Sequence, residues 1–389
     1  MVQRQVGALA QKPSSNVALT VDVISDPQEF LESGHLWDRL VTASGVMHPC
    51  MSHAWLTAWW DCFGAGNDLR VFVVKSDREW IAAAPMMICR TKMYGVSVRR
   101  LEALFNPHTT RYEFPMMDRS DKVYRMLWRA MSDSRNACDA VVFQQFVNDS
   151  PTLDAFEGLA QQEGWRTGRW MAGESPYLRL GPDYDALFNR LSPRERYHLR
   201  KRHYKLSQFG EVDMEVISTH DGVSAAMKDG LSIEAAAWKG RAGTAMISDP
   251  TVERFYLTLA ERAANLGWLR LAFLRVGGKR VAFLYMLDTG GVVYGMKMGY
   301  DPIYHKYSPG NILLTLVLRQ LCDLGRKEFD FQGGRERWKL VWTKESRTHP
   351  WLFLFRDQWR SRLLHRAKFV VLPAVRRFQG MGRTLRPVT

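Results

Sequence analysis

The sequence has no long hydrophobic run and few cysteines. No stretch reaches the roughly eighteen apolar residues that a membrane-spanning helix requires, and residues 1–20 hold no apolar run of signal-peptide length. The five cysteines are scattered, form no CxxC pair and share no metal-ligand spacing with the histidines. These absences argue against a disulfide scaffold. They predict a cytoplasmic protein, soluble or peripheral to a membrane, with no metal site.

Acidic residues are outnumbered by basic ones. The 40 Asp and Glu stand against 54 Lys and Arg, which gives a formal net charge of +14. The excess is concentrated at 190–205 and at 356–386, where Asp357 is the single acid of the second segment. Such clusters bind an anionic surface or substrate, or they simply face solvent. We expect a phospholipid surface or an acidic substrate rather than nucleic acid.

One pattern occurs twice in the 389 residues. Residues 69–86 (LRVFVVKSDREWIAAAPM) align without a gap with residues 269–286 (LRLAFLRVGGKRVAFLYM), and both read as β-hairpins. Each follows an aromatic-rich helical pattern, at 53–63 and at 251–266. The repeat predicts two copies of one α/β unit, at 20–180 and 181–345, between a disordered N-terminus at 1–19 and a basic amphipathic segment at 346–389. Chance similarity of two amphipathic hairpins is the alternative.

The second copy contains the stretch most suggestive of a ligand site, residues 291–334. A strand is predicted at 292–300, where Gly295 and Gly299 allow another backbone or a ligand to approach closely. Ser308-Pro309-Gly310-Asn311 then begins a predicted helix that runs to about residue 324. A helix start favours an anion, so these four residues are a candidate phosphate seat, although they would equally suit an ordinary helix cap. The first copy lacks this sequence, which predicts that its own seat has been lost.

Two carboxylates of the second copy are candidates for proton transfer. The predicted strand at 327–334 directs Phe329 and Phe331 to one face and Asp330 and Gln332 to the other. Glu234 lies in a predicted helix at 222–239, on the same face as Trp238. Either acid has the chemistry of a general base, and the alternative for each is a structural or solvated position.

Several segments together carry a resemblance to a known family. They are Ser52-His53-Ala54-Trp55 with Trp59-Trp60, the basic helix at 194–205, Trp238-Lys239-Gly240, Gly299-Tyr300-Asp301, Tyr307-Ser308-Pro309-Gly310, and Phe329-Asp330-Phe331 with Gly333-Gly334. Through them the chain resembles the CelD/BcsL family, acetyltransferases associated with cellulose biosynthesis. That family is similar in fold to a GNAT domain in tandem and to the Fem-type aminoacyl transferases of cell-wall assembly. The likeness covers residues 29–342. Trp338-Lys339 departs from it, since a Tyr-Lys pair is expected there.

The resemblance implies a fold and an activity. The fold is α/β, with tandem GNAT-like domains whose mixed sheets are flanked by helices, and the activity is acyl transfer from acetyl-CoA or another acyl-CoA. The implied acceptor is an amine or hydroxyl of a small molecule, polysaccharide or lipid. A Fem-like transferase that uses aminoacyl-tRNA, and a non-catalytic scaffold that binds an anionic partner, are the alternatives.

The resemblance also implies roles for individual residues. The cofactor would lie against Gly295, Gly299, Ser308, Pro309, Gly310 and Asn311. Proton transfer and oxyanion binding would fall to Glu234, Asp330, Lys297, Lys339 and Tyr300, with Tyr307 as a second candidate acid. Substrate binding would involve Arg200, Trp238 and Lys239.

Residues 351–378 interleave large apolar side chains with Arg and Lys. This composition suits the headgroup layer of a membrane, and Pro373 argues against a spanning helix. The segment therefore predicts a tether to an anionic membrane at its inner face. The alternative is that it packs its apolar side on the second domain.

Overall fold

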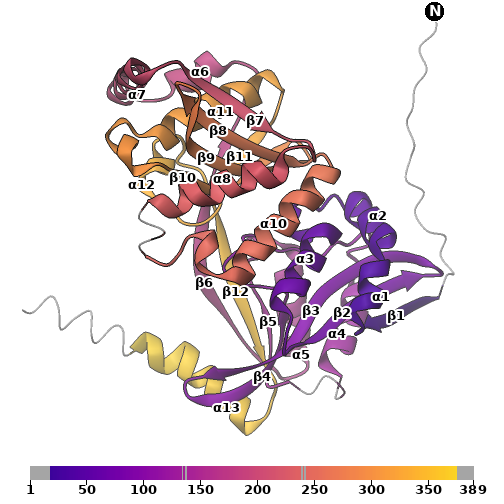
Figure 1. Ribbon diagram of the computed structural model, residues 1–389. Helices are drawn as coiled ribbons and strands as arrows, with labels where there is room; N and C mark the ends of the chain where they lie inside the picture. The colour runs from indigo at the N-terminus through magenta and orange to yellow at the C-terminus, as the bar shows by residue number, and fades with distance from the viewer. Residues whose placement is uncertain (1–17, 134, 136–137, 238–239, 241, 375–389) are drawn as a thin grey trace, which may run out of the picture.

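Twelve strands form one continuous sheet within residues 18–133, 135, 138–237, 240 and 242–374, which the computed structural model describes. The strand order is β1-β2-β3-β4-β5-β12-β6-β11-β10-β9-β8-β7, and helices cover the sheet (Figure 1). The predicted α/β class with a mixed sheet is confirmed. The predicted disordered segment at 1–19 lies outside the described residues except for its last two.

The sheet consists of two units of six strands each. The first unit contributes β1 (Leu19–Ile24), β2 (Asp68–Ser76), β3 (Glu79–Met93), β4 (Val96–Ala103), β5 (Ala140–Phe143) and β6 (Arg166–Arg179). The second contributes β7 (Val212–Ile217), β8 (Leu269–Val276), β9 (Lys279–Thr289), β10 (Val292–Tyr300), β11 (Glu328–Asp330) and β12 (Ser346–Phe355).

The repeat seen in the sequence is present in the fold. Arg70 pairs with Met86 in the β2–β3 hairpin, and Arg270 pairs with Met286 in the β8–β9 hairpin. Both hairpins have an irregularity at the same offset, and in both units the fourth and fifth strands run parallel over three residue pairs. A chance similarity of two hairpins would not extend to the strand order of both units.

The units exchange their last strands. β12 lies between β5 and β6, and β6 in turn pairs with β11 of the second unit. The prediction that residues 346–389 form a separate amphipathic segment is therefore wrong for 346–355, which lie in the middle of the sheet. A central strand is apolar on both faces, and this explains why its sequence resembles an amphipathic segment. Leu352–Phe355 are accordingly at most 2% exposed.

Helices connect the strands. They are α1 (Pro27–Glu32), α2 (Gly34–Ser44), α3 (His53–Phe63), α4 (Asp121–Ser132), α5 (Pro151–Gln162), α6 (Tyr184–Asn189), α7 (Pro193–Leu206), α8 (Val223–Ala236), α10 (Pro250–Asn265), α11 (Pro309–Asp323), α12 (Arg337–Leu340) and α13 (Trp359–Arg366). Short 3₁₀ helices include η1 (Pro49–Met51), η3 (Ser207–Phe209) and η5 (Pro302–Tyr307). Both α7 and α10 begin with a capping Ser or Asp followed by Pro, a start that fixes the first turn.

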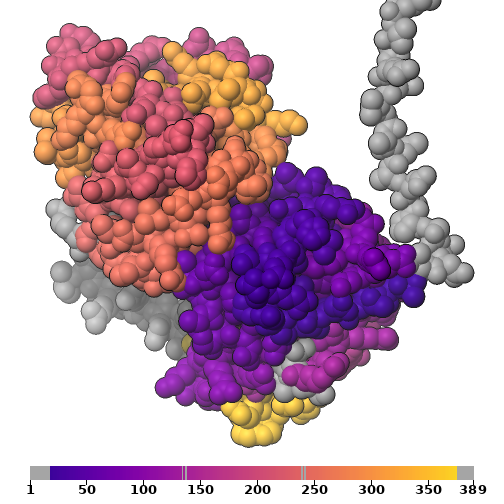
Figure 2. Space-filling model, turned by 45° about the vertical axis from the view of Figure 1, so that its right-hand side comes forward, coloured from indigo at the N-terminus to yellow at the C-terminus, as the bar shows by residue number. Residues whose placement is uncertain are grey.

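One hydrophobic core extends across both units. Trp55 and Trp59 of α3 are buried, and Trp55 meets Phe255 of α10 edge to face with ring centroids 5.1 Å apart. A second core lies beneath α11, on the other side of β8–β11. The units consequently meet over a broad surface (Figure 2).

Candidate active site

The parallel strands β10 and β11 diverge. Their pairing ends at Tyr294 and Asp330, after which β10 pairs only with β9 as far as Tyr300. A bulge between Gly295 and Lys297 bends β10 at this point. β10 thus departs from β11 beyond this point, and Asp330 lies at the apex of the gap.

The two sides of β10 face different surroundings. Lys297 and Gly299 face α10 and α8, because the Lys297 Nζ lies 5.1 Å from the Tyr256 ring and a Cβ on Gly299 would lie 2.5 Å from the Glu234 Cα. Met298 faces α11, where it lies against Gly310. A ligand that passes through the gap would therefore have one end beside α11 and the other beside the first unit.

The two glycines of β10 are explained by packing inside the protein. A Cβ on Gly299 would overlap the backbone of α8, and a Cβ on Gly295 would lie 3.0 Å from the Phe329 ring. The close approach that the sequence predicted is present, but its partners are α8 and Phe329. Packing alone accounts for both glycines, and their contact with a cofactor stays a prediction.

The start of α11 differs from the predicted Ser cap. Ser308 has φ 52° and ψ 57°, the left-handed region, and its side chain makes no capping hydrogen bond. The N–H groups of Asn311 and Ile312 both donate to the Ser308 carbonyl oxygen. Pro309 has no N–H, so the N–H of Gly310 is the one in this turn without an acceptor among the described residues. A left-handed non-glycine residue is strained, and such strain often marks a functional turn.

A groove that we name the basic groove lies beside this turn, between α7, η3 and η5, with a volume of about 520 Å³. Its lining residues are His198, Lys201, Arg202, Lys205, Gln208, Phe209, Lys306 and Tyr307. No acid lines it, and none of its lysines or its arginine forms an ion pair with a described carboxylate. The groove therefore suits a ligand with several negative charges.

On the opposite side of the gap, side chains of both units form a buried polar cluster that we name the junction site. It contains His48, Arg111, Tyr294, Glu328, Asp330, Arg347 and His349. Arg347 donates to Asp330 at 3.3 Å and to Glu328 at 2.8 Å. Asp330 also accepts the N–H of Gln332 at 2.9 Å, and the His48 ring lies 4.7 Å from that of Tyr294.

The junction site shifts the proton affinity of its groups. Burial raises the pKa of Asp330 to about 6, although the Gln332 N–H and the charges of Arg347 and Arg111 oppose the rise. Burial lowers the pKa of His349 to about 4, and burial with the Arg111 charge holds the pKa of His48 well below its ordinary value. Both histidines are therefore neutral at pH 7, while Asp330 is poised to exchange a proton near neutrality.

Two groups of the junction site are available to a ligand. The Nε2 atom of His48 is buried and has no hydrogen-bond partner among the described residues. Arg111 is half-buried and forms no ion pair with any of them. Sequence reasoning missed both, because they come from loops of the first unit that only tertiary structure brings to β11. A weak signal for Arg111 was present, since residues 106–115 hold His108, Arg111 and Glu113 close together.

Lys339 and Glu234 do not have the predicted catalytic placement. The Nζ of Lys339 is buried and donates to the carbonyl oxygens of Gln332 and Gly334 at 2.6 and 3.1 Å, and it pairs with Glu336 at 2.5 Å. Glu234 is fully buried and accepts the N–H of Met246 at 2.9 Å. Both side chains hold backbone groups in place, and their catalytic roles stay predictions.

The remaining predicted residues are placed as follows. Lys297 lies over Tyr256, whose hydroxyl is 3.2 Å from Nδ1 of His108; burial and the Lys297 charge lower the pKa of that histidine to about 4. Tyr300 is half-buried beside Gly310 on the α11 side of the gap. Arg200 is exposed on α7, 5.4 Å from the Phe188 ring. Trp238 and Lys239 lie outside the described residues.

The corresponding gap of the first unit is closed. Tyr112 bridges to Phe146 beyond the end of β5, and its N–H donates to the Gln145 carbonyl oxygen at 2.8 Å. The N–H of Ala83 on β3 donates to the Pro115 carbonyl oxygen at 3.0 Å. This segment therefore adds backbone contacts at both ends of the region that corresponds to the β10–β11 gap. The loss of a cofactor seat from this unit stays a prediction.

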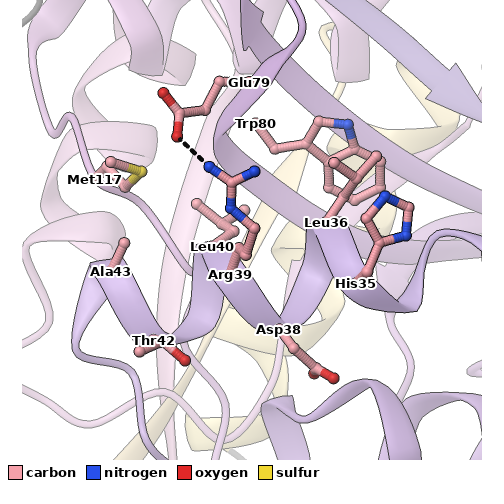
Figure 3. Close-up of a pocket in the computed structure, with 10 residues that line it drawn as sticks. All are labelled: His35, Leu36, Asp38, Arg39, Leu40, Thr42, Ala43, Glu79, Trp80 and Met117. Carbon is pink, nitrogen blue, oxygen red and sulfur yellow. Dashed lines mark hydrogen bonds and ion pairs between the residues drawn. The ribbon is translucent and has the colours of Figure 1, made fainter.

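Another hollow lies on the first unit between α2 and β3. Figure 3 shows Arg39 directed at Glu79 across it, with an ion pair of 3.1 Å, and His35 beside Trp80. Its charged lining residues are exposed, so the Arg39–Glu79 pair contributes little energy.

Comparison with protein families matches residues 193–340 to the family described as "Acetyltransferase (GNAT) domain". This match covers β10, Asp330 and all the residues that line the basic groove. The narrower resemblance to the CelD/BcsL family stays a prediction. No curated protein matches the chain.

Solved structures share the fold over nearly the whole chain. One is FemX, with a TM-score of 0.54 and 12% identity, over 88% of this chain and 99% of that one. Another, from Agrobacterium fabrum, is described as the C-terminal domain (DUF2156) of a candidate lysylphosphatidylglycerol synthetase; it has a TM-score of 0.52 and 15% identity, over 88% and 96% of the two chains. A conserved protein of unknown function from Bacteroides thetaiotaomicron has a TM-score of 0.52 and 10% identity, over 87% and 100%. The predicted Fem-like fold is confirmed by these matches.

Proposed function

We propose that this GNAT-type acyltransferase transfers an acyl group from acetyl-CoA or another acyl-CoA to an amine or hydroxyl of an acceptor bound in the junction site. The observation that carries the proposal is the divergence of β10 and β11 with Asp330 at its apex. The basic groove lies beside the start of α11, and Asp330, with a pKa of about 6, lies where the pairing of β10 with β11 ends. An acyltransferase needs two such places, one for the donor and one for the acceptor.

The residues beside α11 fit an acyl-CoA. Among the described residues, the N–H of Gly310 has no acceptor and the cations of the basic groove have no carboxylate partners, so the phosphate groups would meet N–H and ammonium donors there. Ser308 and Asn311 lie in the same turn as Gly310. We therefore propose that residues 308–311 contact a phosphate group of the donor, as the sequence predicted. When bound, acyl-CoA supplies a thioester carbonyl that accepts a nucleophile.

The junction site would hold and deprotonate the acceptor. Asp330 takes the proton from the attacking amine or hydroxyl, which its raised pKa favours near neutral pH. Arg111 and the Nε2 of His48 are the groups available to orient the acceptor. The bulge leaves Met296 without a partner on β9, so the backbone there can donate to the carbonyl oxygen as negative charge develops on it. Tyr300, on the α11 side of the gap, is the proposed acid.

The acceptor class stays broad. A small molecule, glycan or lipid that carries a nucleophile and an anionic group would match Asp330 and Arg111. We place the reaction in the cytoplasm, where acyl-CoA is formed.

A second candidate donor is aminoacyl-tRNA. Tyr197 and Tyr204 of α7 are 57% and 69% exposed and alternate with basic residues, a pattern that suits a nucleic acid strand. Calorimetric titration of the protein with CoA and with tRNA distinguishes the two. Micromolar binding of CoA favours the first proposal, and RNA binding that weakens steeply with salt, without CoA binding, favours the second.

The donor seat is tested by Asn311→Asp. A carboxylate in the first turn of α11 favours the helix but repels phosphate, so the variant should fold at least as well while its affinity for CoA falls by about fivefold or more. Gly310 is a poorer site for such a test because a side chain there would strike Met298. Asn311→Ala is the uncharged control and should retain most of the affinity. Equal CoA affinity of Asn311→Asp and Asn311→Ala would refute the seat.

A further inference from the structure

The C-terminal helix has one face on the protein and one face directed away from it. α13 continues through a π turn at Ala367–Val371 and remains helical to residue 374. Figure 1 shows it at the end of the first unit, away from the second unit. The predicted alternative, that this segment packs on the second domain, is therefore wrong.

The inner face of the helix is firmly attached to the sheet. Leu364 is 4% exposed, and the hydroxyl of Ser361 donates to the Asp139 carbonyl oxygen at 2.9 Å. Phe369 meets Phe353 of β12 edge to face at 5.9 Å and lies directly over Gly168 of β6. The helix thus keeps its orientation, and its outer face stays outside the core.

The outer face is apolar although it is exposed. Trp359 and Leu363, one turn apart, are 71% and 58% exposed, and Val370 and Val371, further along the helix, are 55% and 54% exposed. An ordinary solvent-facing helix carries polar residues on this face. Four large apolar residues on one exposed helical stretch indicate a surface that is covered during function.

Basic residues border this apolar stripe. Arg360, Arg362 and Arg366 are exposed on both sides of it, and Asp357 is the only acid between residues 357 and 371. Asp357 already pairs with Arg362 at 2.7 Å. The face therefore presents apolar side chains between positive charges, the arrangement of helices that lie in the headgroup layer of an anionic membrane.

We propose that the outward face of α13 and the following π turn, centred on Trp359, Leu363, Val370 and Val371, binds an anionic phospholipid surface. The stripe would enter the headgroup layer while the arginines contact lipid phosphates. A second copy of the chain is the less suitable occupant, because a two-fold contact would bring the same arginines together. Four side chains also bury much less than the roughly 800 Å² per partner of a standard interface.

The test uses the full chain and vesicles. Phosphatidylcholine vesicles with about one-third phosphatidylglycerol should sediment the protein at low salt, whereas phosphatidylcholine alone should not, and added salt should release it. The double variant Trp359→Ser/Leu363→Ser should bind about tenfold more weakly. Because both side chains are exposed, its melting temperature should stay close to that of the wild type.

Two control variants make the result specific to this face. Leu31→Ser/Leu266→Ser removes two other exposed apolar residues, and Tyr197→Ser/Tyr204→Ser alters the exposed tyrosines of α7. Both should bind vesicles like the wild type. The proposal is overturned if the wild type ignores anionic vesicles, if the α13 variant binds as well as the controls do, or if sedimentation equilibrium shows a dimer that this variant dissociates. No acyl donor is needed, so the outcome is independent of the proposed transferase activity.

Discussion

At the scale of single residues, Asp330 has the two properties that a general base requires. It is held in place by Arg347 and the N–H of Gln332, and its pKa of about 6 allows proton exchange near neutrality. Burial without these two partners would only make the ionised carboxylate unfavourable in free energy. The position at the end of the β10–β11 pairing distinguishes it from Glu234, another buried acid of the second unit, whose carboxylate accepts the N–H of Met246.

Asp330→Asn should lower turnover by about 10²-fold or more, because the amide cannot take a proton from the acceptor. The amide oxygen can still accept the N–H of Gln332, so the fold should persist. The matched control is Glu328→Gln, which also removes a partner of Arg347 but lies outside the apex of the gap. Steady-state rates of both variants check the role, and comparable turnover in the two would mean that Asp330 is not the base.

Asp330→Asn should also change how the free energy of unfolding depends on pH. Folding raises the Asp330 pKa from 3.8 to about 6, so the folded state binds this proton more tightly than the unfolded state does. Its contribution to stability is favourable below pH 4 and is lost as pH rises to about 6, by up to about 3 kcal/mol. Asp330→Asn lacks this loss.

Urea unfolding of wild type and variant at pH 4.5 and pH 7 measures the effect. The stability of Asp330→Asn relative to wild type should increase from pH 4.5 to pH 7. The neutral histidines act in the opposite direction, since their lowered pKa values reduce stability as pH falls from 6.5 towards 4. They are common to both proteins and cancel in the difference. A difference that does not change with pH would contradict the raised pKa.

Lys339 illustrates how a buried charge can be mistaken for a catalytic one. Lys339→Met should destabilise the fold by about 2 kcal/mol or more, because the Gln332 carbonyl oxygen would lose its buried donor. Lys344→Met, at an exposed position nearby, is the control and should have little effect. Thermal unfolding of the two variants checks this assignment. A stable Lys339→Met that has lost turnover would restore the catalytic role predicted from the sequence.

At the scale of elements, local pattern predicted the strands and helices of the site. The β-branched and aromatic residues of 292–300 indicated the strand, and the Pro and Gly after Ser308 indicated the start of α11. Local pattern could not predict that Ser308 is left-handed, because that backbone state depends on η5 and on the packing of Gly310 against Met298. His48 and Arg111 were missed for a related reason, since their nearness to Asp330 arises only from contact between the units.

The cations of the basic groove should contribute to the affinity for CoA. Lys201→Gln/Lys205→Gln should weaken CoA binding by about tenfold, because charged contacts to phosphate contribute on the order of 1 kcal/mol each. Pantetheine lacks the phosphate groups, so its binding should not change. Lys228→Gln, on the exposed side of α8, is the control. Calorimetry with both ligands at two salt concentrations gives the answer, and an unaltered CoA affinity would remove the groove from the donor site.

At the scale of the whole molecule, the two units depend on each other. The first unit has its own gap closed by Tyr112, yet it supplies His48 and Arg111 to the junction site of the second. Among the described residues, no helix is long and apolar enough to cross a membrane. A surface contact through α13 would place the first unit against the lipid. The second unit would not need to contact the lipid.

The exchange of β6 and β12 has a consequence for any attempt to divide the chain at the repeat. Residues 181–345 include β11 but neither of the strands beyond it, so β11 would become an edge strand that is paired over only three residues with β10. Expressed alone, 181–345 should aggregate or lack a cooperative melting transition. Chains 1–180 and 181–389, expressed together, should associate into a 1:1 complex, because β12 can then insert between β5 and β6. Size-exclusion chromatography and thermal unfolding of both preparations measure this. If 181–345 alone melts cooperatively and binds CoA as tightly as the whole chain, the exchanged strands are not needed for the fold of the second unit, and the two units are independent domains.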